Sequence, residues 1–289
     1  MIQARATNNP VRKASGKHGL IACAGWFLAL ALSSTASSAC AAGHGRGDEA
    51  ERKSLAEYDL GREAFEGGRF REALGHVERS LAIDEANADV HYLGAVILLA
   101  FCAADETSTD CRFGDAERHA KAALEAAPDM RDAKNTLGVI LVHEKKYDEA
   151  VSVLKPLAED ILYGSPEKAW GNLGWAYLLR GNTDEAIDAL RRALATQPLF
   201  CVGNYRLGLA YEQKHDLVLA EEAFTKALDT NRPECQKLQD GFAARARVGK
   251  ALGKQDQARS DLEHCRDIAP QSIVGKRCAA DLPRADATN

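Results

Sequence analysis

The residues of this chain whose type and spacing could support chemistry are mainly cysteines. Eight are present. An even set of thiols in an exported chain predicts disulfides, whereas in a reducing compartment the same thiols would be buried and free. No Cys-x-x-Cys pair and no suitably spaced histidine completes a zinc site, so we expect no metal and no cofactor. Six cysteines follow residue 53: Cys102, Cys111, Cys201, Cys235, Cys265 and Cys278.

Motifs that would predict catalysis are missing from the sequence. It contains no Gly-x-Ser-x-Gly, no His-Glu-x-x-His and no phosphate-binding loop. His143 and Glu144 begin like a zinc-protease motif, but the second histidine does not follow. We therefore expect no catalytic residues and no small-molecule substrate, and we interpret the chain as a binding module, not an enzyme. A formal net charge of −5 does not favour a nucleic-acid partner.

The first forty residues have the order of a secretory signal. Four basic residues and no acidic one precede an apolar run over 20–32, and small residues follow it. Thirteen apolar residues are too few to cross a bilayer comfortably. We interpret residues 1–39 as a signal peptide, which predicts that the chain is exported.

Cys40 follows this signal at the position of a lipidated cysteine. The small Ala39 before it fits a bacterial lipobox, whereas Ser37 stands where leucine is usual. Ordinary cleavage after Ala39 or Ala41 stays open and would give a soluble periplasmic protein. We favour a lipid on Cys40, which would anchor the chain at the periplasmic face of the outer membrane. Residues 40–53 would then be the lipidated cysteine and a flexible tether.

The rest of the chain consists of sequence repeats. These repeats predict the helices that position the six later cysteines. Self-comparison aligns five Leu-Gly dipeptides at intervals of 33, 44, 36 and 34 residues. This pattern resembles the tetratricopeptide repeat. The fourth copy matches most fully, with Trp170, Leu173, Gly174, Tyr177, Ala186, Leu190, Ala193 and Pro198.

The resemblance implies a fold. Each such unit is two antiparallel helices that cannot bury their apolar faces alone, so the units stack. We therefore predict an all-α protein, a right-handed superhelix of about six helix pairs with a short C-terminal capping helix. The pairs are expected over 54–270, at about 54–86, 87–130, 131–166, 167–200, 201–238 and 239–270, and a capping segment with a disordered tail over 271–289.

The second repeat carries about ten extra residues between its two helices, and they include Cys102 and Cys111. A loop inserted at a turn adds little closure entropy. Cys201 and Cys235 lie one repeat apart, and Cys265 ends the sixth repeat just before the capping segment. Fifteen pairings of six cysteines are possible. We favour 102–111, 201–235 and 265–278.

In this type of repeat the first helix of each pair lines the concave face. Counting inward positions from the register gives a mixed and mostly apolar groove that would hold a protein partner. The alternative is that Trp175 and Leu178 only pack against a neighbouring helix. The groove residues we single out are Tyr58, Arg62, His91, Asn135, Val139, Trp175, Leu178, Tyr205 and Leu209.

A signal, Cys40, six repeats and the stretch "PLFCVGNYRLGLAYEQKHDL" together resemble the pilotin family of PilF, PilW and Tgl. These are tetratricopeptide-repeat lipoproteins of the outer membrane that assist the type IV pilus secretin. The resemblance implies a non-catalytic scaffold that binds a secretin subunit and promotes secretin assembly and multimerisation. A general periplasmic scaffold in envelope biogenesis, without a lipid, is the alternative.

Overall fold

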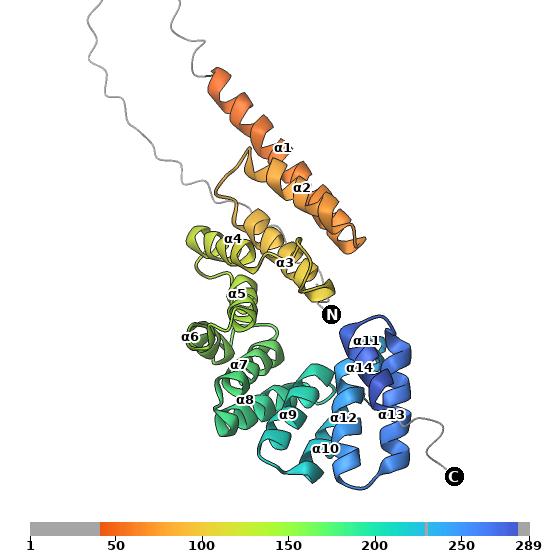
Figure 1. Cartoon of the computed structure of the whole chain (residues 1–289). Helices are drawn as coiled ribbons and strands as arrows, with labels where there is room; N and C mark the ends of the chain where they lie inside the picture. The colour runs from red at the N-terminus through yellow and green to blue at the C-terminus, as the bar shows by residue number, and fades with distance from the viewer. Residues whose placement is uncertain (1–40, 229–230, 283–289) are drawn as a thin grey trace, which may run out of the picture. The chain divides into compact units, whose positions relative to one another are not determined.

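The computed structural model describes residues 41–228 and 231–282, and over these ranges the chain is all α-helical, as predicted (Figure 1). Two compact units are present, and Glu85 ends the first. The fourteen helices of these ranges are α1 (Ala41–Glu66), α2 (Phe70–Leu81), α3 (Ala88–Ala104), α4 (Phe113–Ala126), α5 (Arg131–His143), α6 (Tyr147–Ala158), α7 (Pro166–Arg180), α8 (Thr183–Thr196), α9 (Cys201–Gln213), α10 (Leu217–Leu228), α11 (Pro233–Gln236), α12 (Gln239–Ala251), α13 (Gln255–Ile268) and α14 (Ile273–Asp281).

Helices α1 and α2 form the first unit, and α3 to α14 form the second. Within the second unit, pairs α3–α4, α5–α6, α7–α8, α9–α10 and α12–α13 follow one another and each packs on the next (Figure 1). One helix pair falls at about each expected repeat range, but α1 begins at Ala41, before the first range, and α7 begins at Pro166, the last residue of the third range. The short α11 precedes the sixth pair and was not expected, and α14 packs on α12 and α13.

Close packing inside three pairs depends on a glycine in the first helix. A Cβ added to Gly138, Gly174 or Gly208 would collide with the side chain of Leu154, Leu190 or Phe224, respectively. In each case the glycine and its partner are sixteen residues apart. The Leu-Gly dipeptide therefore recurs because the glycine leaves room for one large side chain from the second helix.

The turns inside five pairs share one backbone feature. A residue with positive φ lies two positions before the second helix begins: Gly68, Lys145, Gly181, His215 and Gly253. This left-handed residue ends the first helix and turns the chain back. The pair α3–α4 has the Cys102–Cys111 insertion at this place instead.

Three disulfides lie within the described ranges. The Cα atoms are 4.4 Å apart in Cys102–Cys111, 5.7 Å in Cys201–Cys235 and 6.1 Å in Cys265–Cys278. The first closes the insertion, the second joins the start of α9 to α11, and the third joins α13 to the capping helix α14. The first and third bridge residues that are 9 and 13 positions apart, whereas the second bridges residues 34 positions apart, about one repeat.

The N-terminal segment differs from our expectation. Residues 41–53, which we expected as a flexible tether, belong to the 26-residue helix α1. Alanine, glutamate, arginine and lysine are frequent there, and these are strong helix formers. The signal over 1–39, the Cys40 lipidation and the tail over 283–289 fall outside the described residues. Among the described helices, none combines the length and apolar character that a membrane span requires.

Candidate partner-binding surface

Three first helices of the second unit are joined by a ladder of polar side chains. Asn172 of α7 donates from Nδ2 to Oδ1 of Asn135 on α5 over 3.0 Å. Arg206 of α9 donates from Nη1 to Oδ1 of Asn172 over 2.9 Å and to the carbonyl of Gly171 over 3.0 Å. These bonds fix the arrangement of three consecutive pairs on the face formed by first helices.

A row of rings lies beside this ladder. The ring of Phe113 stacks on His143 at 5.0 Å, and the edge of His143 meets Trp175 with the same centroid separation. The guanidinium of Arg206 lies over the Trp175 ring, 4.4 Å from its centroid. We call Phe113, His143, Trp175 and Arg206 the Trp175 row. All four side chains are partly exposed, so a partner can reach them.

The cation of the Trp175 row has no acidic partner among the described residues. Burial lowers the pKa of Arg206 to about 10, and its neighbour Tyr205 offsets part of that shift. The group therefore stays charged at neutral pH. Burial likewise lowers the pKa of His143, with Glu106 opposing the shift and Arg206 adding to it, so that this ring is mainly neutral at pH 7.

The Cys102–Cys111 insertion contributes to the same surface. Its Glu106 carboxylate lies 3.8 Å from Nδ1 of His143 and is largely exposed. Asp105 begins the loop and accepts hydrogen bonds from the backbone and the hydroxyl of Thr107 at 2.9 and 2.7 Å. The disulfide and these bonds hold an acidic side chain at the His143 end of the row, while Arg206 lies at the opposite end.

Beyond Arg206 the surface continues to α12. Arg247 of α12 donates from Nε and Nη2 to the two carboxylate oxygens of Glu212 on α9, at 2.6 and 2.7 Å. The hydroxyl of Tyr205 lies in the same region, and burial raises its pKa to about 12. Arg247 has a bidentate acidic partner, which Arg206 lacks.

The residues expected to line the groove occupy different environments in the structure. Asn135 and Trp175 belong to the ladder and the row. Tyr205 and Leu209 are partly buried and pack against the core that contains Phe224, and Val139 is also partly buried. Leu178 is only 6% exposed and packs in the core with Leu190 and Phe224, so its assignment to the groove is wrong. Leu178 lies three residues after Trp175 on α7, a rotation of about 60° around the helix, and this is enough to bring it from the edge of the exposed face into the core.

Three other expected groove residues make contacts that do not involve the Trp175 row. Nδ1 of His91 lies 3.1 Å from Nδ1 of His119 within pair α3–α4, where burial lowers the pKa of His119 to about 4. Tyr58 and Arg62 belong to α1 in the first unit, with the guanidinium 6.0 Å from the ring centroid.

Sequence reasoning missed four contributors to this surface: Phe113, His143, Asn172 and Arg206. One signal could have found the most important of them. Arg206 is the single cation in the otherwise neutral or apolar first three turns of α9. A charged residue in such a setting needs a special environment. The stacked rings could not be predicted, because they come from three different pairs.

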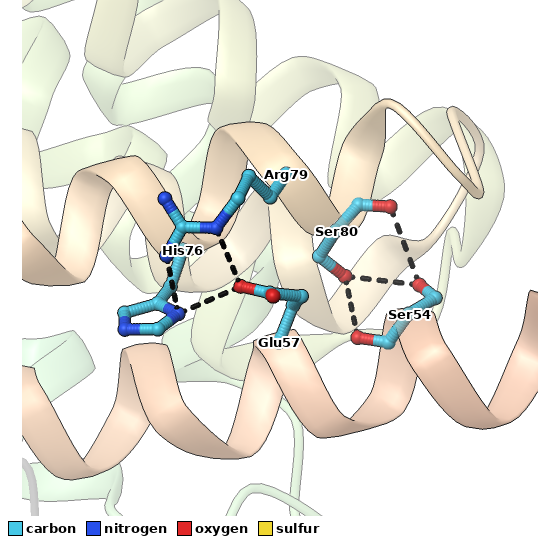
Figure 2. A network of polar contacts seen from close by, with 5 residues as sticks. All are labelled: Ser54, Glu57, His76, Arg79 and Ser80. Carbon is cyan, nitrogen blue, oxygen red and sulfur yellow. Dashed lines mark hydrogen bonds and ion pairs between the residues drawn. The ribbon is translucent and has the colours of Figure 1, made fainter.

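The first unit has its own polar network, between α1 and α2 (Figure 2). Nδ1 of His76 and Nε of Arg79 both contact the Glu57 carboxylate, at 2.7 and 2.8 Å. The hydroxyls of Ser54 and Ser80 lie 2.9 Å apart, and Ser80 also donates to the Ser54 carbonyl over 2.8 Å.

These are residue types of a hydrolytic triad, but their arrangement does not support hydrolysis. Both serines are buried, at 2% and 0% exposure, and each bonds to the other, so neither can reach a substrate. The network instead joins α1 to α2 (Figure 2). Within the described part of the chain, no three histidine, cysteine, aspartate or glutamate side chains are grouped to hold a metal ion.

Comparison with known proteins agrees with the fold. Models described as tetratricopeptide repeat match residues 112–159 and 167–198. A curated relative, type IV pilus assembly protein PilF of Pseudomonas aeruginosa, is 28% identical over 151 residues, covering 52% of this chain and 55% of the relative. The chain therefore aligns with about half the length of that relative.

Solved structures extend the likeness in fold. The crystal structure of PilW, a type IV pilus biogenesis factor, superposes with a TM-score of 0.63 at 22% identity, covering 78% of this chain and 98% of that one. The structure of Pseudomonas aeruginosa PilF gives a TM-score of 0.59 at 20% identity, covering 81% and 98%. At these identities the likeness shows the fold.

Proposed function

We propose that this chain, a tetratricopeptide-repeat protein, is a non-catalytic scaffold of type IV pilus assembly. The observation that carries this proposal is the sequence similarity to PilF, supported by a fold shared with PilW and PilF across nearly all of their lengths. The protein binds a partner through the face formed by its first helices, where the Trp175 row offers partly exposed rings and a charged group.

The finer part of the proposal is a pilotin-like role. The chain is exported, carries a lipid on Cys40 and lies at the periplasmic face of the outer membrane. There it binds secretin subunits and promotes their insertion and multimerisation. The three disulfides fit such an oxidising compartment, since they persist in exported proteins and are rare in the cytosol.

Deleting the gene tests this role. We expect the deletion strain to lose secretin multimers from its outer membrane while secretin monomers remain, and a plasmid-borne copy to restore the multimers. Purification of the wild-type protein from outer membranes should recover secretin subunits. Unchanged multimers together with no recovered secretin would contradict the proposal.

Mass spectrometry of the mature N-terminus separates lipidated from soluble forms. We expect an acylated Cys40, and a mass increase of two hydrogens per disulfide on reduction. A Cys40→Ala variant should leave the outer membrane. A mature chain that begins at Cys40 or Ala42 and carries no lipid would instead favour the general periplasmic scaffold.

A further inference from the structure

We propose that Arg206, with Trp175 and His143, forms a subsite for the side-chain carboxylate of an aspartate or glutamate in an extended segment of the partner protein. This inference rests on the scaffold function proposed above and specifies the chemistry of its contact. It starts from a charge that the fold leaves unbalanced on a surface accessible to a partner.

The environment of Arg206 differs from that of two arginines on α12. Arg245 makes a two-pronged contact with Asp261 at 2.8 and 2.9 Å, and Arg247 makes the corresponding contact with Glu212. Arg206 donates only to the neutral oxygens of Gly171 and Asn172, through Nη1 alone. Partial burial of a cation without an acid is costly. Its Nε and Nη2 donors are left for an external anion.

The chemistry of the site favours a carboxylate over a phosphate. A planar guanidinium fork matches the two oxygens of a carboxylate, and such charge-assisted bonds are strong. Phosphate sites usually combine several positive groups, whereas the Trp175 row has one. His143 is mainly neutral, and the Glu106 carboxylate beside it would repel a doubly charged group.

The position of the site favours an internal side chain over a chain terminus. Helix α9, which carries Arg206, contacts the first helix α7 through Arg206 itself and the first helix α12 through Glu212. A bound segment that follows this face would therefore have contacts before and after its acidic residue. A terminal carboxylate would use only one of these two flanks.

A second arginine over a tryptophan provides a matched control. The guanidinium of Arg192 lies 4.8 Å from the ring centroid of Trp170, but Arg192 is exposed on α8, the second helix of its pair. Its guanidinium also lies over an indole ring, but the residue is not buried. Arg192→Gln should therefore leave carboxylate binding unchanged.

The test follows the indole N–H resonances of Trp175 and Trp170 in the exported, oxidised protein. Three tripeptides are titrated: blocked Leu-Glu-Leu, blocked Leu-Gln-Leu, and Leu-Gln-Leu with a free terminal carboxylate. We expect a saturable shift of Trp175, not of Trp170, with the blocked glutamate peptide. Its affinity should exceed that of the other two by about tenfold, the usual value of one charge-assisted contact.

Arg206→Gln should remove this preference, and Arg206→Lys should reduce it, because lysine keeps the charge but not the fork. If Arg206→Gln fails to fold, the lysine variant decides. The absence of a saturable Trp175 shift, or equal affinity for the glutamate and glutamine peptides, would overturn the proposal. Tighter binding of the free terminus would overturn its assignment to a side chain.

The subsite and the scaffold function can fail separately. A wild-type protein that prefers the glutamate peptide but does not affect secretin multimers would keep the subsite and reject the pilus role. If the protein supports multimers and Arg206→Gln supports them equally, the pilus role stands and the subsite is rejected. Loss of multimers with Arg206→Gln, but not with Arg192→Gln, supports both.

Discussion

Two helix pairs of this molecule solve the same packing problem with different chemistry. Pair α9–α10 closes on an aromatic ring, since Phe224 is fully buried against Gly208. Pair α1–α2 buries only small and medium apolar side chains, Ala64, Ala73 and Val77. It adds hydrogen bonds, with Ser54 against Ser80 and Glu57 between His76 and Arg79. The repeat therefore fixes the helix arrangement, while the interface between the helices can be filled by one large ring or by smaller apolar side chains with added hydrogen bonds.

The largest expected effect comes from removing the ring. Phe224→Ala should lower the free energy of unfolding by about 3–5 kcal/mol, because it leaves a cavity in the core of the second unit. Hydrogen exchange resolved by helix should show faster opening of α9 and α10, with α1 and α2 unaffected. Val218→Ala on the exposed face of α10 is the control and should change stability by less than about 0.5 kcal/mol.

Filling the space that the ring needs should also destabilise this pair. Gly208→Ala places a methyl group against Phe224 and should cost about 1–3 kcal/mol. Gly249 of α12 is the matched control, since an added Cβ there would meet its neighbours at an ordinary 3.7 and 3.8 Å. Gly249→Ala should be neutral or stabilising. Equal losses in denaturant unfolding would contradict the role of Gly208.

The polar pair should respond to loss of one hydroxyl. Ser80→Ala removes the donor to the Ser54 carbonyl and should cost about 1–2 kcal/mol, because buried polar atoms of Ser54 lose a partner. The double variant Ser54→Ala with Ser80→Ala should recover part of that loss, since a matched apolar contact replaces it. A double variant that loses the sum of both single effects would show that the hydroxyls act independently.

A smaller effect on stability is expected from the turns inside the two pairs. His215 adopts a φ of 61° before α10, whereas the equivalent residue before α2 is Gly68 with a φ of 73°. Left-handed backbone is unfavourable for residues with a Cβ. His215→Gly should therefore stabilise pair α9–α10 by about 1 kcal/mol, and Gly68→Ala should destabilise α1–α2. Thermal unfolding of both variants measures the two signs.

The smallest expected difference between the two pairs is their response to acid. Hydrogen bonds from His76 and then Arg79 hold the pKa of Glu57 below its ordinary value of 4.5. Its stabilising contribution is present above that value and is lost as the pH falls through the lower folded pKa. Pair α1–α2 should thus loosen in acid while the contact of Phe224 with Gly208 does not. Hydrogen exchange, corrected for the intrinsic pH dependence of amide exchange, measures the protection of α1 and α2. Glu57→Gln should reduce the acid dependence of that protection.

Features that arise from local spacing could be predicted from the sequence. The Leu-Gly dipeptides identified helix pairs because the glycine must face a large side chain of the same repeat. The stacking of Trp175 between His143 and Arg206 could not be predicted, because these residues come from three repeats whose rotation is set by packing. Leu178 was misplaced for the same reason. Residues 41–53 were misjudged because glycines and polar residues suggested a tether despite their helix-forming neighbours.

The sixteen-residue separation between each glycine and its large partner has a consequence for how the chain folds. The two helices of a pair can pack together as soon as the residues of that repeat are free to fold, because their main contacts lie within the repeat. Low contact order of this kind favours fast folding. A chain emerging in an extended form through a narrow channel could therefore order one pair after another. Each completed pair would then shield its apolar residues before the next repeat arrives.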